Sequence, residues 1–159
     1  MHINILLPDE KFLSAAQQLI ENAEKKIWIS TFKAEITTKP RGRKLHHFFD
    51  TLFEKAASGV DVRFMMNRPD GGKHVPISNE FAIRALLENK IKVRRLPHVR
   101  CCHAKLILTD YCGSILGSHN LSVKSCLGNF ECSMYVLDPD IEEKLRLTYL
   151  DTWATTRKI

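Results

Sequence analysis

The chain has 159 residues, of which 44% are hydrophobic, and this is enough for one hydrophobic core but argues against two domains. The formal net charge of +6 suits a polyanionic partner, although many basic proteins bind no nucleic acid. No stretch approaches membrane-spanning length, and the apolar run in the first eight residues is too short for a secretory signal. We therefore expect one cytoplasmic domain over residues 1–159, with no stable membrane association.

Helical and strand patterns alternate along the chain. Three helix–strand pairs are expected, at residues 12–23 and 26–32, 45–57 and 60–66, and 79–89 and 91–96. A strand is expected from Glu131 to Leu137, and a last helix from Pro139 to Thr155, with Asp138 as its N-cap. This rhythm is typical of an α/β fold in which a mixed β-sheet is sandwiched between helices.

A β-hairpin is expected between the third pair and the strand at Glu131. Residues 104–109 are apolar and β-prone, so His103 and Lys105 should project from one face of that strand. A short turn and a second apolar run then return Ser118 and Asn120 to the same place. We expect a short helix after Asn120, with Ser118 or Asn120 near its N-cap, where free N–H groups favour an anion.

An imidazole, an ammonium, an amide and a hydroxyl in one place suit a phosphodiester substrate. A neutral imidazole can attack phosphorus to give a covalent phosphohistidine. The ammonium and the amide N–H can hold the non-bridging oxygens and stabilise the charge that builds in the transition state. Such a scheme requires no metal or other cofactor.

The segment from His103 to Asn120 reads H-x-K-x4-D-x6-G-S-x-N and resembles the HKD signature of the phospholipase D superfamily, present in one copy. The phrase from Leu52 to Arg63 is similar to an element that precedes this signature across the superfamily. The resemblance covers about residues 10–137 and implies a phospholipase D-like fold. Within the signature, Gly117 is expected to support the site.

Two acidic residues have different expected roles. In the resembled family, a glutamate in an N-x-E position hydrogen-bonds and orients the active-site histidine, and Glu131 matches it here. The alternative for Glu131 is a solvated strand end. Counted from His103, Asp110 lies on the opposite strand face, so we expect a structural acceptor for the turn rather than a general base.

A single signature supplies one histidine, which can act as the nucleophile, but no second group to act as the acid. The leaving oxygen must be protonated, and water must later be activated to cleave the phosphoenzyme. The resemblance implies the homodimer of small single-signature members, in which a two-fold axis brings together two copies of His103, Lys105 and Asn120. His119 is the nearest rival for the second acid, but strand alternation turns it away, toward a packed or solvent side.

Basic residues gather at residues 39–47 and 92–100. The second cluster leads directly into the signature, so its arginines could track a phosphate backbone, whereas the first could be a solubilising loop. The candidate substrate-binding residues are Arg94, Arg95, Arg100, Lys124 and Arg43.

The five cysteines form an odd set without C-x2-C spacing, which indicates reduced, mostly buried thiols. A zinc site built from Cys101, Cys102, His103 and Cys112 stays open as an alternative, although adjacent cysteines rarely both reach one ion.

The leading hypothesis is a metal-independent endonuclease that cleaves DNA or RNA, with His103, Lys105, Ser118, Asn120 and Glu131 as its catalytic set. The arginine-rich approach to the signature favours nucleic acid, and no interfacial amphipathic helix is evident. Two alternatives stay open: a phospholipase D-type phospholipid hydrolase, which would use the same catalytic residues, and a non-catalytic nucleic-acid-binding module.

Overall fold

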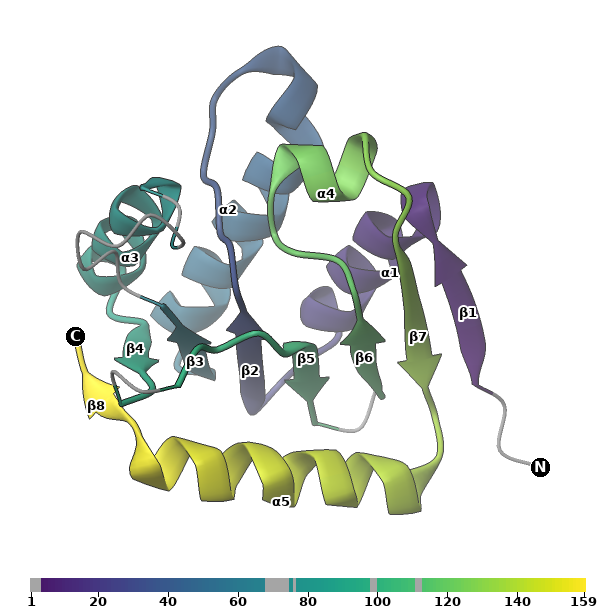
Figure 1. Ribbon diagram of the computed structural model, residues 1–159, viewed down its shortest axis with the longest axis vertical. Coiled ribbons are helices and arrows are strands. Elements are labelled where there is room, and N and C mark those ends of the chain that lie inside the picture. Colours follow the sequence, from purple (N-terminus) through teal and green to yellow (C-terminus); the bar gives the residue numbers. More distant parts are fainter. Residues whose placement is uncertain (1–3, 68–74, 76, 98–99, 111–112) are drawn as a thin grey trace.

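The computed structural model describes residues 4–67, 75, 77–97, 100–110 and 113–159. An eight-stranded mixed sheet runs through the molecule in the order β1-β7-β6-β5-β2-β3-β4-β8 (Figure 1). The strands are β1 (Ile5–Pro8), β2 (Lys26–Thr31), β3 (Asp61–Met66), β4 (Lys92–Arg95), β5 (Lys105–Thr109), β6 (Ser114–Gly117), β7 (Cys132–Val136) and β8 (Arg157–Lys158). Pairing is parallel between β2 and β3 and between β3 and β4, and antiparallel elsewhere.

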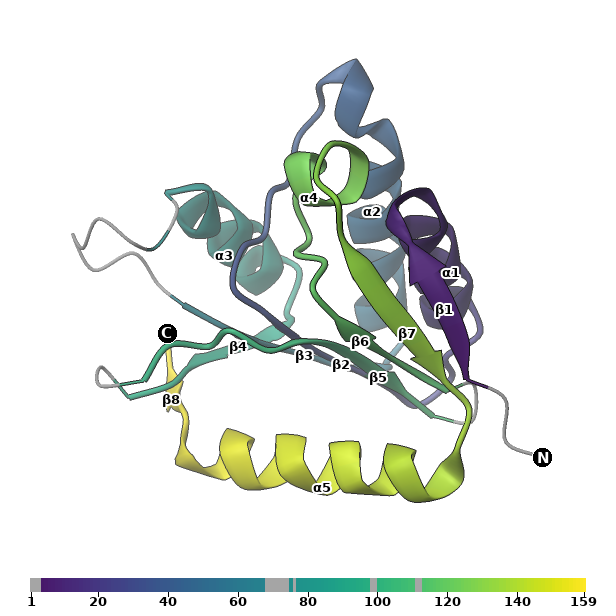
Figure 2. The ribbon, with the colours of Figure 1, turned by 45° about the vertical axis from the view of Figure 1, so that its right-hand side comes forward.

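Helices cover both faces of the sheet. Those described are α1 (Asp9–Glu21), α2 (Arg43–Ala57), α3 (Ser78–Glu88), α4 (Val123–Leu127) and α5 (Pro139–Thr155), with a short 3-10 helix, η1 (Pro40–Gly42). Figure 2 shows α5 along one face and the other helices on the opposite side. The expected α/β class, with a mixed sheet between helices, is confirmed. None of the described helices is long and apolar enough to cross a bilayer.

Alternation along the central strand divides the core in two. Ile27 and Ile29 of β2 are buried in the larger apolar cluster, with residues of α1 and α2. Trp28, between them, faces α5 and stacks on Tyr149 with ring centroids 5.5 Å apart. A one-residue slip of β2 would exchange these faces, so the two cores fix the register of the sheet.

The expected elements are found within a few residues of their predicted ends, and α5 has its predicted bounds. The Asp138 carboxylate accepts N–H bonds from the first turn of α5, as expected of an N-cap. The short helix expected after Asn120 is α4, and its N-cap is Ser122, two residues after Asn120 and four after Ser118. Those two side chains bond to other segments instead.

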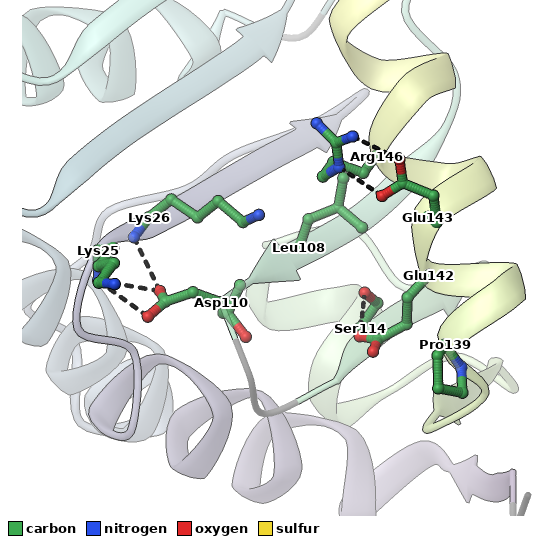
Figure 3. Close-up of a pocket in the computed structure, with 10 residues that line it drawn as sticks. Lys25, Lys26, Leu108, Asp110, Ser114, Pro139, Glu142, Glu143 and Arg146 are labelled. Atoms are coloured by element: carbon green, nitrogen blue, oxygen red, sulfur yellow. Dashed lines mark hydrogen bonds and ion pairs between the residues drawn. The ribbon is translucent and has the colours of Figure 1, made fainter.

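Asp110 holds the connection between α1 and β2. Its carboxylate accepts backbone N–H bonds from Glu24, Lys25 and Lys26 at 2.8 to 3.2 Å. Figure 3 shows the bonds from Lys25 and Lys26. Partial burial acts to raise the pKa of Asp110, but these three bonds outweigh it and hold that pKa below its usual value. Asp110 is therefore structural, as expected, but it holds the α1–β2 connection. Its own turn includes residues 111–112, which lie outside the described residues.

Asp110→Asn should lower the free energy of unfolding by about 2 kcal/mol at pH 7, because an amide accepts these bonds less strongly than a carboxylate. The folded-state pKa of Asp110 is lowered, so its contribution is present above the unfolded value of 3.8 and is lost as pH falls through the folded value. Urea unfolding of wild type and variant from pH 7 to pH 2.5 should show the difference shrinking below about pH 4. Asp151→Asn, at an exposed position, is the matched control.

A cavity of about 350 Å³ lies between Asp110 and α5 (Figure 3). Its charged side chains are mutually engaged, since Ser114 donates to Glu142 and Arg146 bonds to Glu143. It also lies at the far end of β5 from His103. This cavity is therefore separate from the residues of the signature.

Candidate active site

His103 and Lys105 are brought together at the start of β5. The Lys105 ammonium donates to the His103 carbonyl oxygen at 2.6 Å and lies 3.0 Å from the imidazole Nδ1. His103 precedes the strand, so this contact, rather than strand alternation, pairs the two side chains. Partial burial lowers the pKa of Lys105, while the charge of Glu131 acts in the opposite direction.

The ring of Phe32, just after β2, borders both groups. Its centroid is 5.3 Å from that of the His103 imidazole and 5.9 Å from the Lys105 ammonium. Such an aromatic face attracts the ammonium and limits the positions open to the imidazole. Phe32 was not predicted, because nothing in the pattern of β2 shows that the residue after it turns toward the signature.

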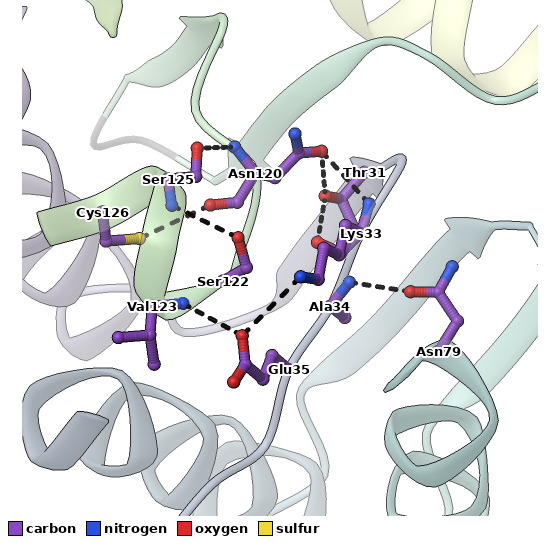
Figure 4. A network of polar contacts seen from close by, with 10 residues as sticks. All are labelled: Thr31, Lys33, Ala34, Glu35, Asn79, Asn120, Ser122, Val123, Ser125 and Cys126. Carbon is purple, nitrogen blue, oxygen red and sulfur yellow. Dashed lines mark hydrogen bonds and ion pairs between the residues drawn. The ribbon is translucent and has the colours of Figure 1, made fainter. Parts of the chain in front are cut away.

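Asn120 enters the site with its amide orientation fixed. Its Oδ1 accepts the backbone N–H of Lys33 at 3.1 Å and lies 3.4 Å from the Thr31 hydroxyl (Figure 4). A backbone N–H can only donate, so the group facing it must be the amide oxygen. The Asn120 NH₂ group consequently points away from these partners, as Figure 4 shows, and is available as a donor to an anion.

Ser118 and Gly117 lie where β6 meets β7. The Ser118 hydroxyl accepts the N–H of Cys132 at 3.0 Å and donates to the carbonyl oxygen of the same residue at 3.3 Å. Gly117 pairs with Lys105, and a Cβ there would clash with Ser133 and lie 2.6 Å from the Cys132 carbonyl oxygen. The close approach of β7 therefore requires glycine at this position.

Glu131 lies immediately before β7 and is joined to Asn120 through one serine. The Ser125 hydroxyl accepts from the Asn120 N–H at 2.8 Å and donates to the Glu131 carboxylate at 2.9 Å, and Asn129 donates at 3.0 Å. Partial burial acts to raise the pKa of Glu131, but hydrogen bonds, among them those from Asn129 and Ser125, hold it below its usual value.

These contacts bear on both readings of Glu131. A half-buried carboxylate with several partners is not a freely solvated strand end. No hydrogen bond between Glu131 and His103 occurs within the described part of the chain. The expected orienting role consequently stays a prediction.

Two buried asparagines position the segments that carry His103 and Phe32. Asn67, after β3, pairs with the backbone of Cys102 through its Oδ1 at 2.8 Å and its Nδ2 at 2.9 Å. Asn79, fully buried at the start of α3, accepts from Ala34 N and donates to the carbonyl oxygens of Phe32 and Asn67, all at 2.9 to 3.0 Å. Sequence reasoning missed both, because an asparagine at an element end is usually a cap or turn residue.

His119 is buried against α1. Its ring stacks on Phe12 at a centroid distance of 4.2 Å, and its Nδ1 lies 2.8 Å from the Ser133 hydroxyl. Burial lowers the pKa of His119. His119 therefore points to a packed side, which is one of the two positions that strand alternation allowed. These contacts give no support to a role of His119 as the second acid.

The candidate substrate-binding residues divide into two groups. Arg100 is exposed and borders a recess that His103 also lines. Arg94 differs from expectation, because its guanidinium lies 4.7 Å over the Trp153 ring and donates to the Trp153 carbonyl oxygen at 3.4 Å. Arg94 is thus held against α5. Arg95 is half-buried in β4, paired with Arg157 of β8.

The first basic cluster is brought near the signature by the fold. A Cβ on Gly42 of η1 would lie 3.1 Å from a methyl group of Val123 in α4. The start of α2, with exposed Arg43, therefore lies beside the helix that carries exposed Lys124. Sequence spacing could not predict that this basic cluster lies near the segment that follows Asn120.

The thiols divide evenly between buried and exposed. Cys102 and Cys126 are buried, and burial raises the pKa of each to about 12. Cys101 and Cys132 are exposed, so the expectation of mostly buried thiols was wrong for the described cysteines. Cys112, one residue of the alternative zinc site, lies outside the described residues. Within those that are described, no group of three or more His, Cys, Asp or Glu side chains could hold a metal ion.

Comparison with known proteins gives a family and a number of structural likenesses. Residues 17–153 match the family model described as cardiolipin synthase, PLD-like domain. An uncharacterized protein of Streptococcus mutans serotype c is 28% identical over 106 residues, which is 65% of this chain and 22% of that protein. The chain thus spans less than a quarter of that relative's length.

Two solved structures resemble the whole chain. Nuc from Salmonella typhimurium, a phospholipase D family member, has a TM-score of 0.75 and 18% identity, covering 100% of this chain and 97% of that one. NucT from Helicobacter pylori has a TM-score of 0.78 and 15% identity, covering 100% of both chains. At such identities the likeness establishes the fold.

Proposed function

Because the chain belongs to the PLD-like domain family that its residues 17–153 match, we propose that it is a metal-independent phosphodiesterase that cleaves nucleic acid as an endonuclease. Residues 1–159 would act as one catalytic domain. The observation that carries the proposal is the contact between the Lys105 ammonium and the His103 imidazole, together with an Asn120 amide whose oxygen is bonded to Lys33 N and whose NH₂ group faces away from that partner.

The nucleophile is the neutral His103 imidazole. When its Nε2 attacks phosphorus, an N–P bond forms, the P–O bond to the leaving oxygen breaks, and that oxygen takes a proton from a second acid. Water then attacks the phosphohistidine, a base accepts the water proton, and the imidazole is released. The Lys105 ammonium and the Asn120 NH₂ group hold the non-bridging oxygens and stabilise the charge that develops on them.

The Lys105 ammonium faces both ring nitrogens of His103, at 3.0 Å from Nδ1 and 3.3 Å from Nε2, so this contact does not fix the tautomer of the ring. Attack by Nε2 requires the ring hydrogen on Nδ1 and an Nε2 lone pair that is not bonded to the ammonium. A phosphate that draws the ammonium away from the ring lets Nδ1 carry the hydrogen and donate it to a carboxylate, for which Glu131 is the candidate.

The second acid is the His103 imidazole of another subunit, because the chain contains one H-x-K sequence and His119 is 2% exposed and stacked on Phe12. We therefore predict a two-fold homodimer. Analytical ultracentrifugation at concentrations used for activity should give about twice the chain mass of 18.3 kDa. An active monomer would contradict the shared site.

Nucleic acid is favoured over phospholipid by the exposed cations around the site. Arg100 lines the same recess as His103, and Arg43 and Lys124 lie on two neighbouring elements. A nucleic-acid backbone bound at His103 would therefore place its adjoining phosphates near these cations. If these cations contribute, cleavage should weaken steeply as salt concentration rises.

The test is incubation of the protein with single-stranded DNA, double-stranded DNA, RNA and anionic phospholipid vesicles in excess EDTA. We expect internal cleavage of at least one nucleic acid and no release of lipid headgroup. Headgroup release without nucleic-acid cleavage would instead identify a phospholipid hydrolase. Tight nucleic-acid binding without turnover of any substrate would identify a binding module.

A further inference from the structure

A recess of about 180 Å³ adjoins the candidate nucleophile on the α5 side of the sheet. His103, Ala104 and Arg100 form part of its wall. The sheet side of the recess is formed by Ser30 of β2, Met65 of β3 and Leu106 of β5. The helix side is formed by Thr148, Tyr149 and Thr152 of α5. Because His103 itself lines the recess, a group bound there would be next to a phosphate held by this imidazole.

Ser30 is the residue of this recess that packing does not explain. Ser30 pairs with Met65 of β3 and Leu106 of β5, so the three side chains point toward α5 together. The serine is 2% exposed, and its hydroxyl is buried without a hydrogen-bond partner within the described residues. A buried hydroxyl that bonds to nothing is unfavourable, and an apolar side chain at this position would be more stabilising.

The recess combines apolar walls with a few polar atoms. Met65, Leu106 and the Tyr149 ring supply apolar surface. The hydroxyls of Thr148 and Thr152 donate to carbonyl oxygens of their own helix, which leaves their lone pairs free to accept. A nucleobase has this composition, with flat apolar faces and an edge of donors and acceptors, and ligand sites of this kind are mostly apolar with few placed polar groups.

We propose that this recess is a subsite for the base of a nucleotide adjoining the scissile phosphate, and that Ser30 is its specificity-determining hydroxyl. The inference rests on the proposed function, since it places the scissile phosphate at His103. The base stacks against the apolar wall, its edge meets Ser30 and the threonine hydroxyls, and Arg100 at the entrance contacts the adjoining backbone phosphate.

The test compares two short single-stranded DNA substrates in EDTA, one with normal bases and one with abasic sites on both sides of the only cleavable bond. Wild type should cleave the normal substrate about ten-fold better in kcat/KM, with most of the difference in KM. Ser30→Val and Thr152→Leu add methyl groups to the recess from opposite sides, and each should reduce this ratio to about one. Thr155→Leu, at an exposed position of α5, should retain the ratio of ten.

Ser30→Ala keeps the space and removes the hydroxyl. It should preserve discrimination against the abasic substrate while reducing by several-fold the preference among the four bases at this position. Thermal unfolding checks that each variant folds. If Ser30→Val does not fold, the test rests on Thr152→Leu, which changes α5 rather than the sheet. A wild-type ratio near one, or a ratio near ten in a folded variant with a filled recess, would overturn the subsite. If the wild type cleaves only RNA, the same pair of substrates is made in RNA, and failure of the wild type to cleave any nucleic acid in EDTA would instead overturn the proposed function.

Discussion

Replacement of His103 by Ala is expected to reduce EDTA-resistant cleavage of oligonucleotides by at least about 10³-fold in kcat, because no N–P bond can form. Lys105 and Asn120 remain able to hold a phosphate, so substrate should still bind with similar affinity. Initial rates on labelled oligonucleotide, together with binding measured by fluorescence anisotropy, separate these two effects.

The covalent intermediate provides a second readout of the same variant. A rapid detergent quench at alkaline pH preserves phosphohistidine, so wild type should retain labelled nucleotide on the protein and His103→Ala should not. Equal thermal midpoints and equal sedimentation would show that the variant keeps its fold and its assembly. Undiminished cleavage by His103→Ala in EDTA would remove His103 from the mechanism.

Replacement of Asn79 by Leu is expected to reduce the free energy of unfolding by about 3–5 kcal/mol. The substitution preserves approximate volume but leaves the Ala34 N–H and the carbonyl oxygens of Phe32 and Asn67 without their partner in the core. Urea unfolding followed by circular dichroism measures the change. The wild-type slope against urea should be retained if the unfolded state is unaffected.

Two further variants show whether the hydrogen bonds are the cause. Asn89→Leu, at the exposed end of the same helix, should change the free energy of unfolding by less than about 0.5 kcal/mol. Asn79→Asp keeps an acceptor for Ala34 N but places a carboxylate oxygen against two carbonyl oxygens, so its loss should be large at pH 7 and smaller in acid. Equal, small losses for Asn79→Leu and Asn89→Leu would show that α3 does not anchor the site.

Local chemistry made much of the fold predictable. Asp138 followed by Pro139 is a strong helix start, and α5 begins there. The apolar alternation of β5 and β6 predicted a hairpin, and the observed antiparallel pairing, with Lys105 opposite Gly117, confirms it. Signals contained within a few neighbouring residues were therefore sufficient for these elements.

Features that depend on distant segments could not be predicted in this way. β1 is four residues long and ends in proline, and its pairing with β7 is set by packing rather than by its own pattern. β8 has two basic residues and no apolar alternation. Arg94 was predicted to contact phosphate from its charge and its position in the basic cluster before the signature, whereas its guanidinium lies over the Trp153 ring. Asn67 and Asn79 became identifiable only when their backbone partners were known.

The first and last strands of the chain occupy opposite edges of the sheet, and Asp9 reaches Glu131 across 122 positions of sequence. Closing loops of that length is entropically costly, so such contacts form late in folding. A partly synthesised polypeptide on the ribosome would hold His103 well before it held the glutamate and β7. Competence to act would consequently arise only after Glu131 and β7 have also been synthesised.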